Sequence, residues 1–325
     1  MKKKAWLLIF ILIITGCLSG CLQKNGNYND IDSDGDGYTD DVDVFPNNAS
    51  EWKDTDGDGY GDNSDSSPYD PEKWSNEPKD NSLGEMGGLH YVFWNFDTPY
   101  FNSLTINLTI LYEPDNRDGL YFQMYQATIN GVGFFFGLQT RMYNPIKHIV
   151  GKGILFSRWE TKNLSNVKTV EEGWSENDDY EGDFVGIRKL YDWSNHSYQF
   201  KLQYIESDDV GDWYGVWIND LDESTQEFLG SIRFPITSSN KTGISDGGIT
   251  WTELYYKKVE LTPIPTWHVS IDGIHVTDNK IPAKSATSSY SDINHTDIWY
   301  DEITKKIHLT MGPNVERKHE QGKLF

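Results

Sequence analysis

The chain has almost no cysteine. Cys17 and Cys21 are the only two among its 325 residues. Cleavage before Cys21 would leave a chain with no pair of thiols to oxidise. Stability must then come from a buried core and bound metal, because disulfides are not available.

Long apolar runs, basic clusters and helical periodicity are also missing. The longest apolar run, residues 5–14, has about ten residues, whereas a membrane-spanning helix needs about 20. The formal net charge is −22 and no basic cluster follows the first few residues, which argues against a nucleic-acid partner. No segment repeats its apolar residues with a period of 3.6, which excludes parallel α/β architectures.

Sequence signatures of catalysis are absent as well. No G-x-S-x-G elbow occurs, the eight histidines show no H-x-x-x-H spacing, and no strand carries a tight E-x-D-x-x-E pattern. A glycosidase needs two carboxylates, and candidates exist by residue type alone: Glu160, Glu181, Asp183, Glu206 and Glu253. We therefore predict no catalytic residues.

The first residues are typical of an exported protein. Lys2, Lys3 and Lys4 precede the apolar run, as in a secretory signal peptide. The following Leu18-Ser19-Gly20-Cys21 resembles the lipobox of prokaryotic lipoproteins. That resemblance implies lipidation of Cys21, a signal peptide over residues 1–20 and a tether over 21–31. An uncleaved anchor helix is the alternative, and either reading places the protein outside the cell, tethered to the membrane.

Two acidic loops come next. Residues 32–43 (DSDGDGYTDDVD) and 54–65 (DTDGDGYGDNSD) repeat one pattern, and each begins with the D-x-D-x-D-G calcium signature. A Ca²⁺ ion takes six to eight oxygen ligands, which such a loop supplies from alternating carboxylates and one backbone carbonyl. The predicted ligands are Asp32, Asp34, Asp36, Tyr38, Asp40 and Asp43 in the first loop, and Asp54, Asp56, Asp58, Tyr60, Asp62 and Asp65 in the second. Tyr38 and Tyr60 would bind only through their main-chain carbonyls.

The loops belong to a longer repeat of 22 residues. Segment 32–53 aligns on 54–75, with Pro46 over Pro68 and Trp52 over Trp74. The flanks contain proline and asparagine and do not predict the helices of an EF-hand. The segment resembles the thrombospondin type 3 calcium repeat, which implies a helix-poor chain wrapped around bound ions.

A solvated acidic linker is the simpler alternative for this segment. Residues 30–72 hold thirteen Asp, two Glu and one Lys, and so carry 14 of the 22 net negative charges. Such a density of like charge repels itself unless cations neutralise it. Because the pattern recurs in register, we favour Ca²⁺ binding coupled to ordering of the segment.

The rest of the chain predicts an all-β fold. After a polar linker over residues 76–88, apolar and polar residues alternate with period two in many short runs. The runs are 89–96, 104–110, 119–129, 132–140, 147–158, 184–191, 198–204, 213–218, 227–234, 249–260, 267–276 and 303–311. We expect a β-sandwich or jelly-roll-like domain over 89–261 and a β-rich C-terminal extension over 262–325, either as further strands of the sandwich or as an appended unit.

Several segments of this region resemble a secreted β-sandwich family of unknown function, family 3472 of the unknown-function series. They are 136–140 (FGLQT), 154–159 (ILFSRW), 180–186 (YEGDFVG), 191–193 (YDW), 198–200 (YQF) and 251–253 (WTE). Tyr180 replaces the first glycine of the family's Gly-Glu-Gly-x-Gly stretch. The resemblance implies an extracellular domain often found near carbohydrate-binding modules, and it implies no catalytic residues.

Aromatic residues make up 14% of the chain. Sugars stack on flat aromatic rings, and ligand pockets combine such rings with a few polar groups. Trp159, Trp193 and Trp251 are the predicted ligand-binding residues, although large aromatic residues also fill sandwich cores. The leading hypothesis is a lipid-anchored surface protein that holds its sandwich on a Ca²⁺-stiffened spacer and binds glycan or envelope polymer. A carbohydrate-active hydrolase and a structural envelope protein without ligand are the alternatives.

Overall fold

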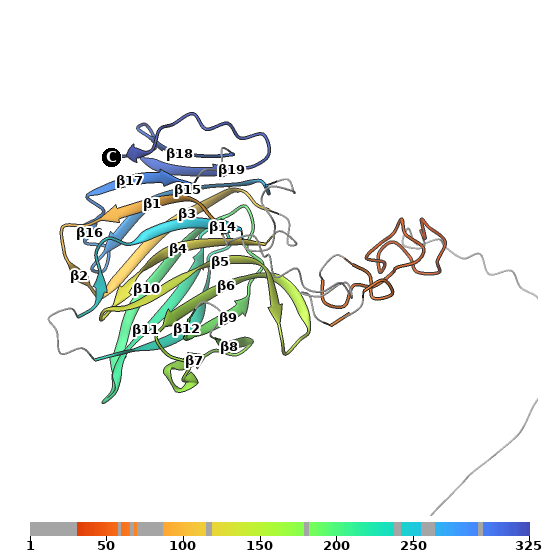
Figure 1. Cartoon of the computed structure of the whole chain (residues 1–325), viewed down its shortest axis with the longest axis horizontal. Helices are drawn as coiled ribbons and strands as arrows, with labels where there is room; N and C mark the ends of the chain where they lie inside the picture. Colours follow the sequence, from red (N-terminus) through yellow and green to blue (C-terminus); the bar gives the residue numbers. More distant parts are fainter. Residues whose placement is uncertain are drawn as a thin grey trace, which may run out of the picture. The chain divides into compact units, whose positions relative to one another are not determined.

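The structure is a computed structural model of the chain (Figure 1). It describes residues 31–57, 60–65, 68–69, 87–114, 119–178, 182–236, 242–254, 264–291 and 295–325. The chain divides into two compact units, Met1–Trp52 and Lys53–Phe325. The predicted signal peptide, Cys21 and most of the tether and linker lie outside the described residues, and Gly87 and Gly88 of the linker open the first strand.

The second unit is a β-sandwich of two antiparallel sheets, as predicted. The larger sheet has 11 strands, nine of them in the order β20-β17-β1-β14-β4-β5-β6-β9-β8, which can be followed down Figure 1 from β17. Their bounds are Gly322–Lys323, Ser285–Tyr290, Gly87–Asn95, Ile249–Leu254, Leu120–Ile129, Val132–Asn144, Ile149–Trp159, Phe184–Leu190 and Gly173–Asp178. The short strands β2 (Tyr100–Phe101) and β13 (Ile244–Ser245) complete it.

The smaller sheet has nine strands. Eight follow the order β18-β19-β15-β3-β10-β11-β12-β7, and β16 pairs with β15. In that order, with β16 last, the bounds are Thr296–Asp301, Lys306–Met311, Trp267–Val276, Ser103–Tyr112, Ser197–Ser207, Gly211–Asp220, Thr225–Pro235, Val167–Thr169 and Ile281–Pro282. The one helix in the described chain is a 3-10 turn, Leu164–Asn166, and no described helix is long and apolar enough to cross a membrane.

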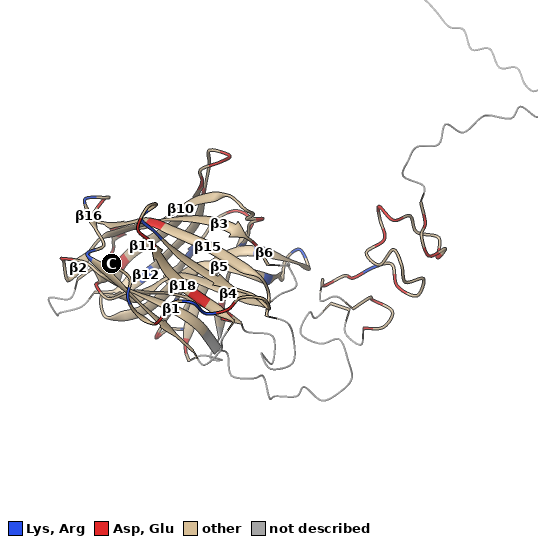
Figure 2. Ribbon diagram, turned by 90° about the horizontal axis from the view of Figure 1, so that it is seen from above, with Lys and Arg blue, Asp and Glu red and all other residues tan. Residues whose placement is uncertain are grey.

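Period-two alternation builds the core between the two sheets. On β3 the side chains of Leu104, Ile106, Leu108 and Ile110 are all buried, and residues of both sheets pack against them. Charged residues lie mainly in the turns and at the strand ends (Figure 2). Burial of this apolar face is what holds the sheets together.

The C-terminal extension is part of the same sandwich. Strand β15 pairs with β3 in the smaller sheet, and β17 pairs with β1 in the larger one. Strands β18 and β19 form a hairpin, paired from Thr296↔Met311 to Asp301↔Lys306. The appended-unit alternative is therefore wrong for residues 264–325.

Several strands were not predicted, among them β17 and β8, which lack alternating apolar residues. Strand β17 reads SATSSY and β8 reads GWSEND. Both are held in place by neighbours in the sheet, β17 between β1 and β20, and β8 against β9. Their positions depend on tertiary pairing, which local propensity does not report.

Candidate functional site

The first acidic loop, in unit Met1–Trp52, is folded by its own carboxylates. Asp32 accepts hydrogen bonds from the backbone N–H groups of Gly35 (2.7 Å) and Gly37 (3.0 Å). Gly35 and Gly37 have φ of +81° and +104°, a region that favours glycine. Carboxylate oxygens of Asp32, Asp34 and Asp36 lie within 4.8 Å of one another.

Three carboxylate oxygens of this loop are buried without a donor. Asp34 Oδ2, Asp36 Oδ2 and Asp43 Oδ2 have no hydrogen-bond partner among the described residues, and Asp43 is only 7% exposed. The other oxygen of Asp43 accepts the Phe45 N–H at 2.7 Å. Unpaired buried carboxylate oxygens are costly, and a hard cation would satisfy all three. The residues present therefore fit a Ca²⁺ ion.

Asp40 has a structural role in the first loop. Its two oxygens accept the backbone N–H (2.8 Å) and the hydroxyl (2.7 Å) of Ser33, and its own N–H donates to Ile31 O. The ring of Tyr38 stacks on Trp52 with centroids 5.0 Å apart, so the tryptophan near the end of the first repeat packs on the loop. That Asp40 and the Tyr38 carbonyl also bind the ion stays a prediction.

The second loop, in unit Lys53–Phe325, repeats the same contacts 22 residues later. Asp62 accepts the N–H (2.7 Å) and hydroxyl (2.6 Å) of Thr55, and Asp54 accepts the N–H of Gly57 at 2.7 Å. Asp56 and Asp65 are buried, with 1% and 8% exposure. Asp58 lies outside the described residues, and the Tyr60 ring is exposed.

The three predicted tryptophans do not lie together. Trp193 is fully buried in the core, where its Nε1 donates to Gly153 O and its ring packs edge-on against Trp267. It cannot stack against a ligand without disrupting the core, so its prediction as a ligand-binding residue is wrong. Trp159 and Trp251 are half-buried, and both lie on the outer face of the 11-stranded sheet.

Trp251 belongs to an aromatic group on β1 and β14 of that outer face. Tyr91 on β1 is its register partner, and the two rings stack with centroids 5.7 Å apart. Phe93 continues the group along β1, stacked against Tyr91 at 6.3 Å. Trp251 Nε1 donates to Gln126 Oε1 of β4 at 2.9 Å, which fixes the indole in place.

An amide and a carboxylate lie next to this aromatic group. Gln123 on β4 is the register partner of Trp251, and its Nε2 donates to Glu253 Oε2 at 3.4 Å. Both side chains are 6% exposed, and Gln123 Oε1 has no hydrogen-bond partner among the described residues. Burial raises the pKa of Tyr91, and the nearby Glu253 carboxylate raises it further. We name Tyr91, Trp251, Gln123, Gln126 and Glu253 the aromatic–amide site.

The sequence did not predict Gln123 as a site residue. Strand β4 contains a register shift between Gln123 and Tyr125, so simple alternation does not report which residues face outward. Gly137 of β5 lies opposite Gln123, and a Cβ there would clash with the Phe122 carbonyl oxygen and the Gln123 Cα. A glycine in that strand is the signal that marks the close approach.

The far half of the same face carries a second aromatic group. Phe135, Leu155, Trp174 and Trp159 form an apolar cluster, with Phe135 and Trp159 centroids 5.0 Å apart. Strand β6 is three strands from β14, which corresponds to about 14 Å at the usual spacing of about 4.8 Å. The outer side of the sheet thus carries two separate aromatic groups, and in the second only Trp159 is partly exposed.

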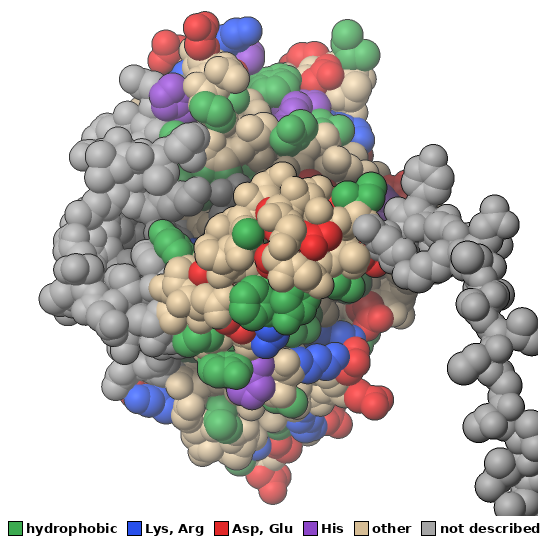
Figure 3. All heavy atoms as spheres, turned by 90° about the vertical axis from the view of Figure 1, so that its right-hand side faces the viewer, with side chains coloured by type: hydrophobic (Ala, Val, Ile, Leu, Met, Phe, Trp, Pro, Cys, Tyr) green, Lys and Arg blue, Asp and Glu red, His purple; other side chains and the backbone are tan. Residues whose placement is uncertain are grey.

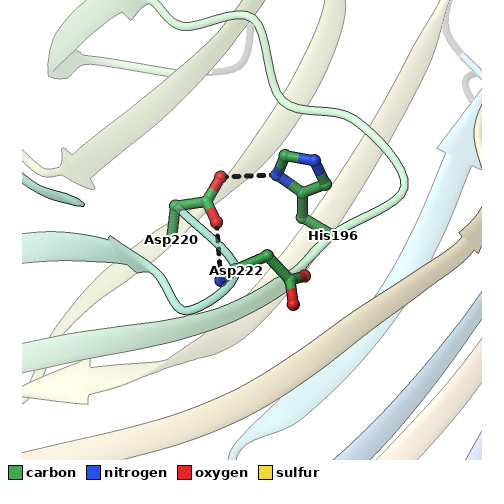
Figure 4. Close-up of side chains that lie close together, drawn as sticks. All are labelled: His196, Asp220 and Asp222. Atoms are coloured by element: carbon green, nitrogen blue, oxygen red, sulfur yellow. Dashed lines mark hydrogen bonds and ion pairs between the residues drawn. The ribbon is translucent and has the colours of Figure 1, made fainter. Parts of the chain in front are cut away.

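A separate polar group lies at the end of the smaller sheet and consists of His196, Asp220 and Asp222 (Figure 4). His196 Nδ1 lies 2.8 Å from Asp220 Oδ2, and this hydrogen bond raises the histidine pKa. Asp220 Oδ1 accepts the N–H groups of Asp222 and Glu223, and Asp222 Oδ2 accepts the Ser197 N–H. These bonds close the turn between β11 and β12, so the group is explained without a ligand.

Charge on the visible surface is mixed. On the face drawn in Figure 3, coloured basic side chains lie beside acidic ones and do not gather in a patch.

No family model matches the chain, and neither does any curated protein. The chain is similar to a solved structure of scytalido-glutamic peptidase with a transition state analog inhibitor. The identity is 9% and the TM-score 0.37, over 70% of this chain and 98% of that chain. At these values the similarity assigns neither an activity nor a residue role here.

Proposed function

We propose that this chain is an exported, lipid-anchored surface protein whose Ca²⁺-binding repeats carry a glycan-binding β-sandwich. The aromatic–amide site carries the proposal. Stacked rings at Tyr91 and Trp251 suit the apolar face of a sugar, while Gln123 and Gln126 offer the donors and acceptors that fix its hydroxyl groups.

The site favours a polar, uncharged ligand. Gln123 Oε1 is an acceptor buried without a partner among the described residues, and a ligand hydroxyl would satisfy it. The negative charge of the Glu253 carboxylate would repel an anionic sugar. Neutral glycans are therefore the expected ligands.

A glycan array with the full chain in detergent tests this proposal. We expect binding to neutral glycans, which Trp251→Ala weakens because it removes the stacking surface. Trp217→Ala is the matched control, since Trp217 is also half-buried but packs on Phe228 in the smaller sheet. Equal binding by wild type and Trp251→Ala would show that the aromatic–amide site is not the binding site. No binding at all would favour a structural envelope protein.

A hydrolase is the second candidate, because Glu253 is a buried carboxylate bonded to an amide. Its register partners are Gly88 and Tyr121, so the neighbouring strands supply no second carboxylate of the kind a glycosidase uses. Product analysis on any bound glycan, with wild type and Glu253→Gln, decides between the two. Glycan cleavage that Glu253→Gln abolishes while binding persists would establish an enzyme.

The lipid anchor rests on the sequence around Cys21 and has its own test. Cys21→Ser should move the protein from the detergent phase to the aqueous phase, because a thioether-linked lipid no longer forms. Cys17→Ser is the matched control and should remain in the detergent phase. Aqueous partitioning of wild type would contradict the anchor.

A further inference from the structure

A hollow at one end of the sandwich is separate from the aromatic–amide site. It measures about 560 Å³ and lies among β2, the start of β3, β10 and the turn after β15. Its lining includes Tyr100, Asn102, Ser103, Gln203, Tyr204 and Asp278. Small-molecule sites commonly span roughly 300–1,000 Å³, so the hollow is large enough for a sugar unit or two.

The turn that borders the hollow is held in an uncommon backbone conformation. Thr277, Asp278 and Asn279 have φ of 54°, 53° and 65°, and for a β-branched residue such as Thr277 this is rare. Ser103 fixes the turn: its Oγ accepts the Asp278 N–H at 2.6 Å and donates to Asp278 Oδ1 at 3.1 Å. The carboxylate is therefore presented at a defined position.

The lining chemistry selects the ligand. It combines the rings of Tyr100, Phe101 and Tyr204 with neutral amides and hydroxyls, and the described lining residues include no Lys, Arg or His. Several polar groups are oriented by the protein, since the Tyr204 hydroxyl lies 2.9 Å from Ser207 Oγ and Asn102 Oδ1 accepts from the Tyr214 hydroxyl at 3.4 Å. The Gln203 side-chain amide makes no hydrogen bond to another described side chain, so it is available to bond to a ligand.

We infer that this hollow is a second glycan-binding site, which takes a neutral sugar unit and excludes anionic ones. Asp278 is the single charged residue among the described residues of the lining and repels acidic sugars, while the amides and hydroxyls bond to sugar hydroxyls. Two sites on one domain bind a polymer with higher apparent affinity than either site alone.

Calorimetry with the full chain and neutral trisaccharides (cellotriose, maltotriose, xylotriose and mannotriose) tests the second site. We expect two binding events for at least one probe, of which Gln203→Trp removes one by filling the hollow and Trp251→Ala removes the other. Gln203→Ala leaves the strand packing intact and should weaken the same event as Gln203→Trp. Sialyllactose, an acidic trisaccharide, should not bind in the hollow.

The outcomes separate this site from the aromatic–amide site. If Gln203→Trp leaves every event unchanged while Trp251→Ala abolishes binding, the hollow is not a site and the proposed function stands. If only Gln203→Trp abolishes binding, the hollow is the site and the aromatic–amide site is not. No uptake of any neutral trisaccharide at millimolar concentration overturns the inference.

Discussion

Alternation predicts that the apolar residues of a strand face the core and the polar ones face outward, but on β14 this arrangement is reversed. Thr250 and Thr252 are fully buried, whereas Trp251 and Glu253 between and after them face outward. The buried hydroxyls are paired: Thr250 Oγ1 donates to Met124 O at 2.7 Å, and Thr252 Oγ1 lies 2.7 Å from His90 Nε2. A buried hydroxyl is tolerated only when bonded, and such partners are not visible in the sequence.

Trp193 shows the same limit in the opposite direction. It follows β9 in an irregular segment, where no alternation exists to assign a face. The sequence could predict that some tryptophans face outward, but it could not distinguish Trp251 from Trp193. The face that each tryptophan takes depends on its partners in the folded chain. For Trp193 these are the Gly153 carbonyl and the Trp267 ring.

At the residue scale we predict that the contribution of His196 to folding stability depends on pH. Its pKa is raised from 6.5, first by the hydrogen bond to Asp220, so its stabilising effect is complete below pH 6.5 and is lost as pH rises through the folded-state pKa. His196→Gln should lower the urea midpoint more at pH 5.5 than at pH 8.5. The difference should stay below about 1 kcal/mol, because His196 is partly exposed.

Asp220→Asn is the control for this effect. Asparagine keeps a carbonyl oxygen for the Asp222 and Glu223 N–H groups but removes the negative charge beside His196. In that background the effect of His196→Gln should differ less between the two pH values, and the remaining difference comes from the Asp222 and Glu223 carboxylates, which also raise the histidine pKa. An undiminished pH dependence in Asp220→Asn would mean that Asp220 does not control His196.

At the scale of elements, the repeat and the sandwich differ in how far the sequence predicts them. The 22-residue period was read from sequence, and the described parts of both loops show the same contacts at that offset, as Asp40 with Ser33 and Asp62 with Thr55 illustrate. Local side-chain to backbone bonds determine these loops. Strand β17 instead depends on β1, from which it is nearly 200 residues distant in the chain.

Removal of residues 264–325 should therefore unfold the sandwich. Strands β15 and β19 bury Trp267, Val269, Ile271, Ile307 and Leu309. At about 1.5–3 kcal/mol for each side chain the loss is roughly 10 kcal/mol, comparable with the entire net stability of a domain. The shortened chain should show no cooperative urea transition by tryptophan fluorescence.

A chain that begins at residue 76 is the comparison for that deletion. This shortened chain lacks a segment of similar length but keeps every strand from β1 to β20. It should therefore unfold cooperatively. A cooperative transition in the chain ending at residue 263 would show that β15 to β20 form a separate unit after all.

At the scale of the whole molecule, the charge distribution couples ion binding to order. Fourteen of the 22 net negative charges fall within residues 30–72, while the sandwich residues that follow carry mixed charge. Mutual repulsion opposes a compact repeat, and bound cations would remove it. The proposed Ca²⁺ ions thus belong to the architecture that presents the sandwich, and catalysis at them is not expected.

Calcium titration by calorimetry tests this coupling. We expect uptake at about 0.1–1 mM, the range of extracellular calcium modules. Asp43→Asn should weaken uptake about tenfold, since it removes the charge of a buried carboxylate whose Oδ2 has no donor among the described residues, while the new amide oxygen still accepts the Phe45 N–H. The matched control is Asp41→Asn, which makes the same charge change at an exposed residue whose carboxylate accepts the Thr39 hydroxyl.

The two variants separate a coordination site from a diffuse ion atmosphere. Net charge changes equally in both, so simple counter-ion condensation would weaken uptake equally, and to a small extent. Coordination requires that Asp43→Asn lose affinity and that Asp41→Asn keep it. It also requires that Ca²⁺ change the fluorescence of Trp52, whose ring packs on Tyr38 inside the loop. Equal Ca²⁺ affinities of the two variants would mean that the segment is a solvated acidic spacer. The sandwich would then follow an extended chain whose length depends on salt and not on calcium.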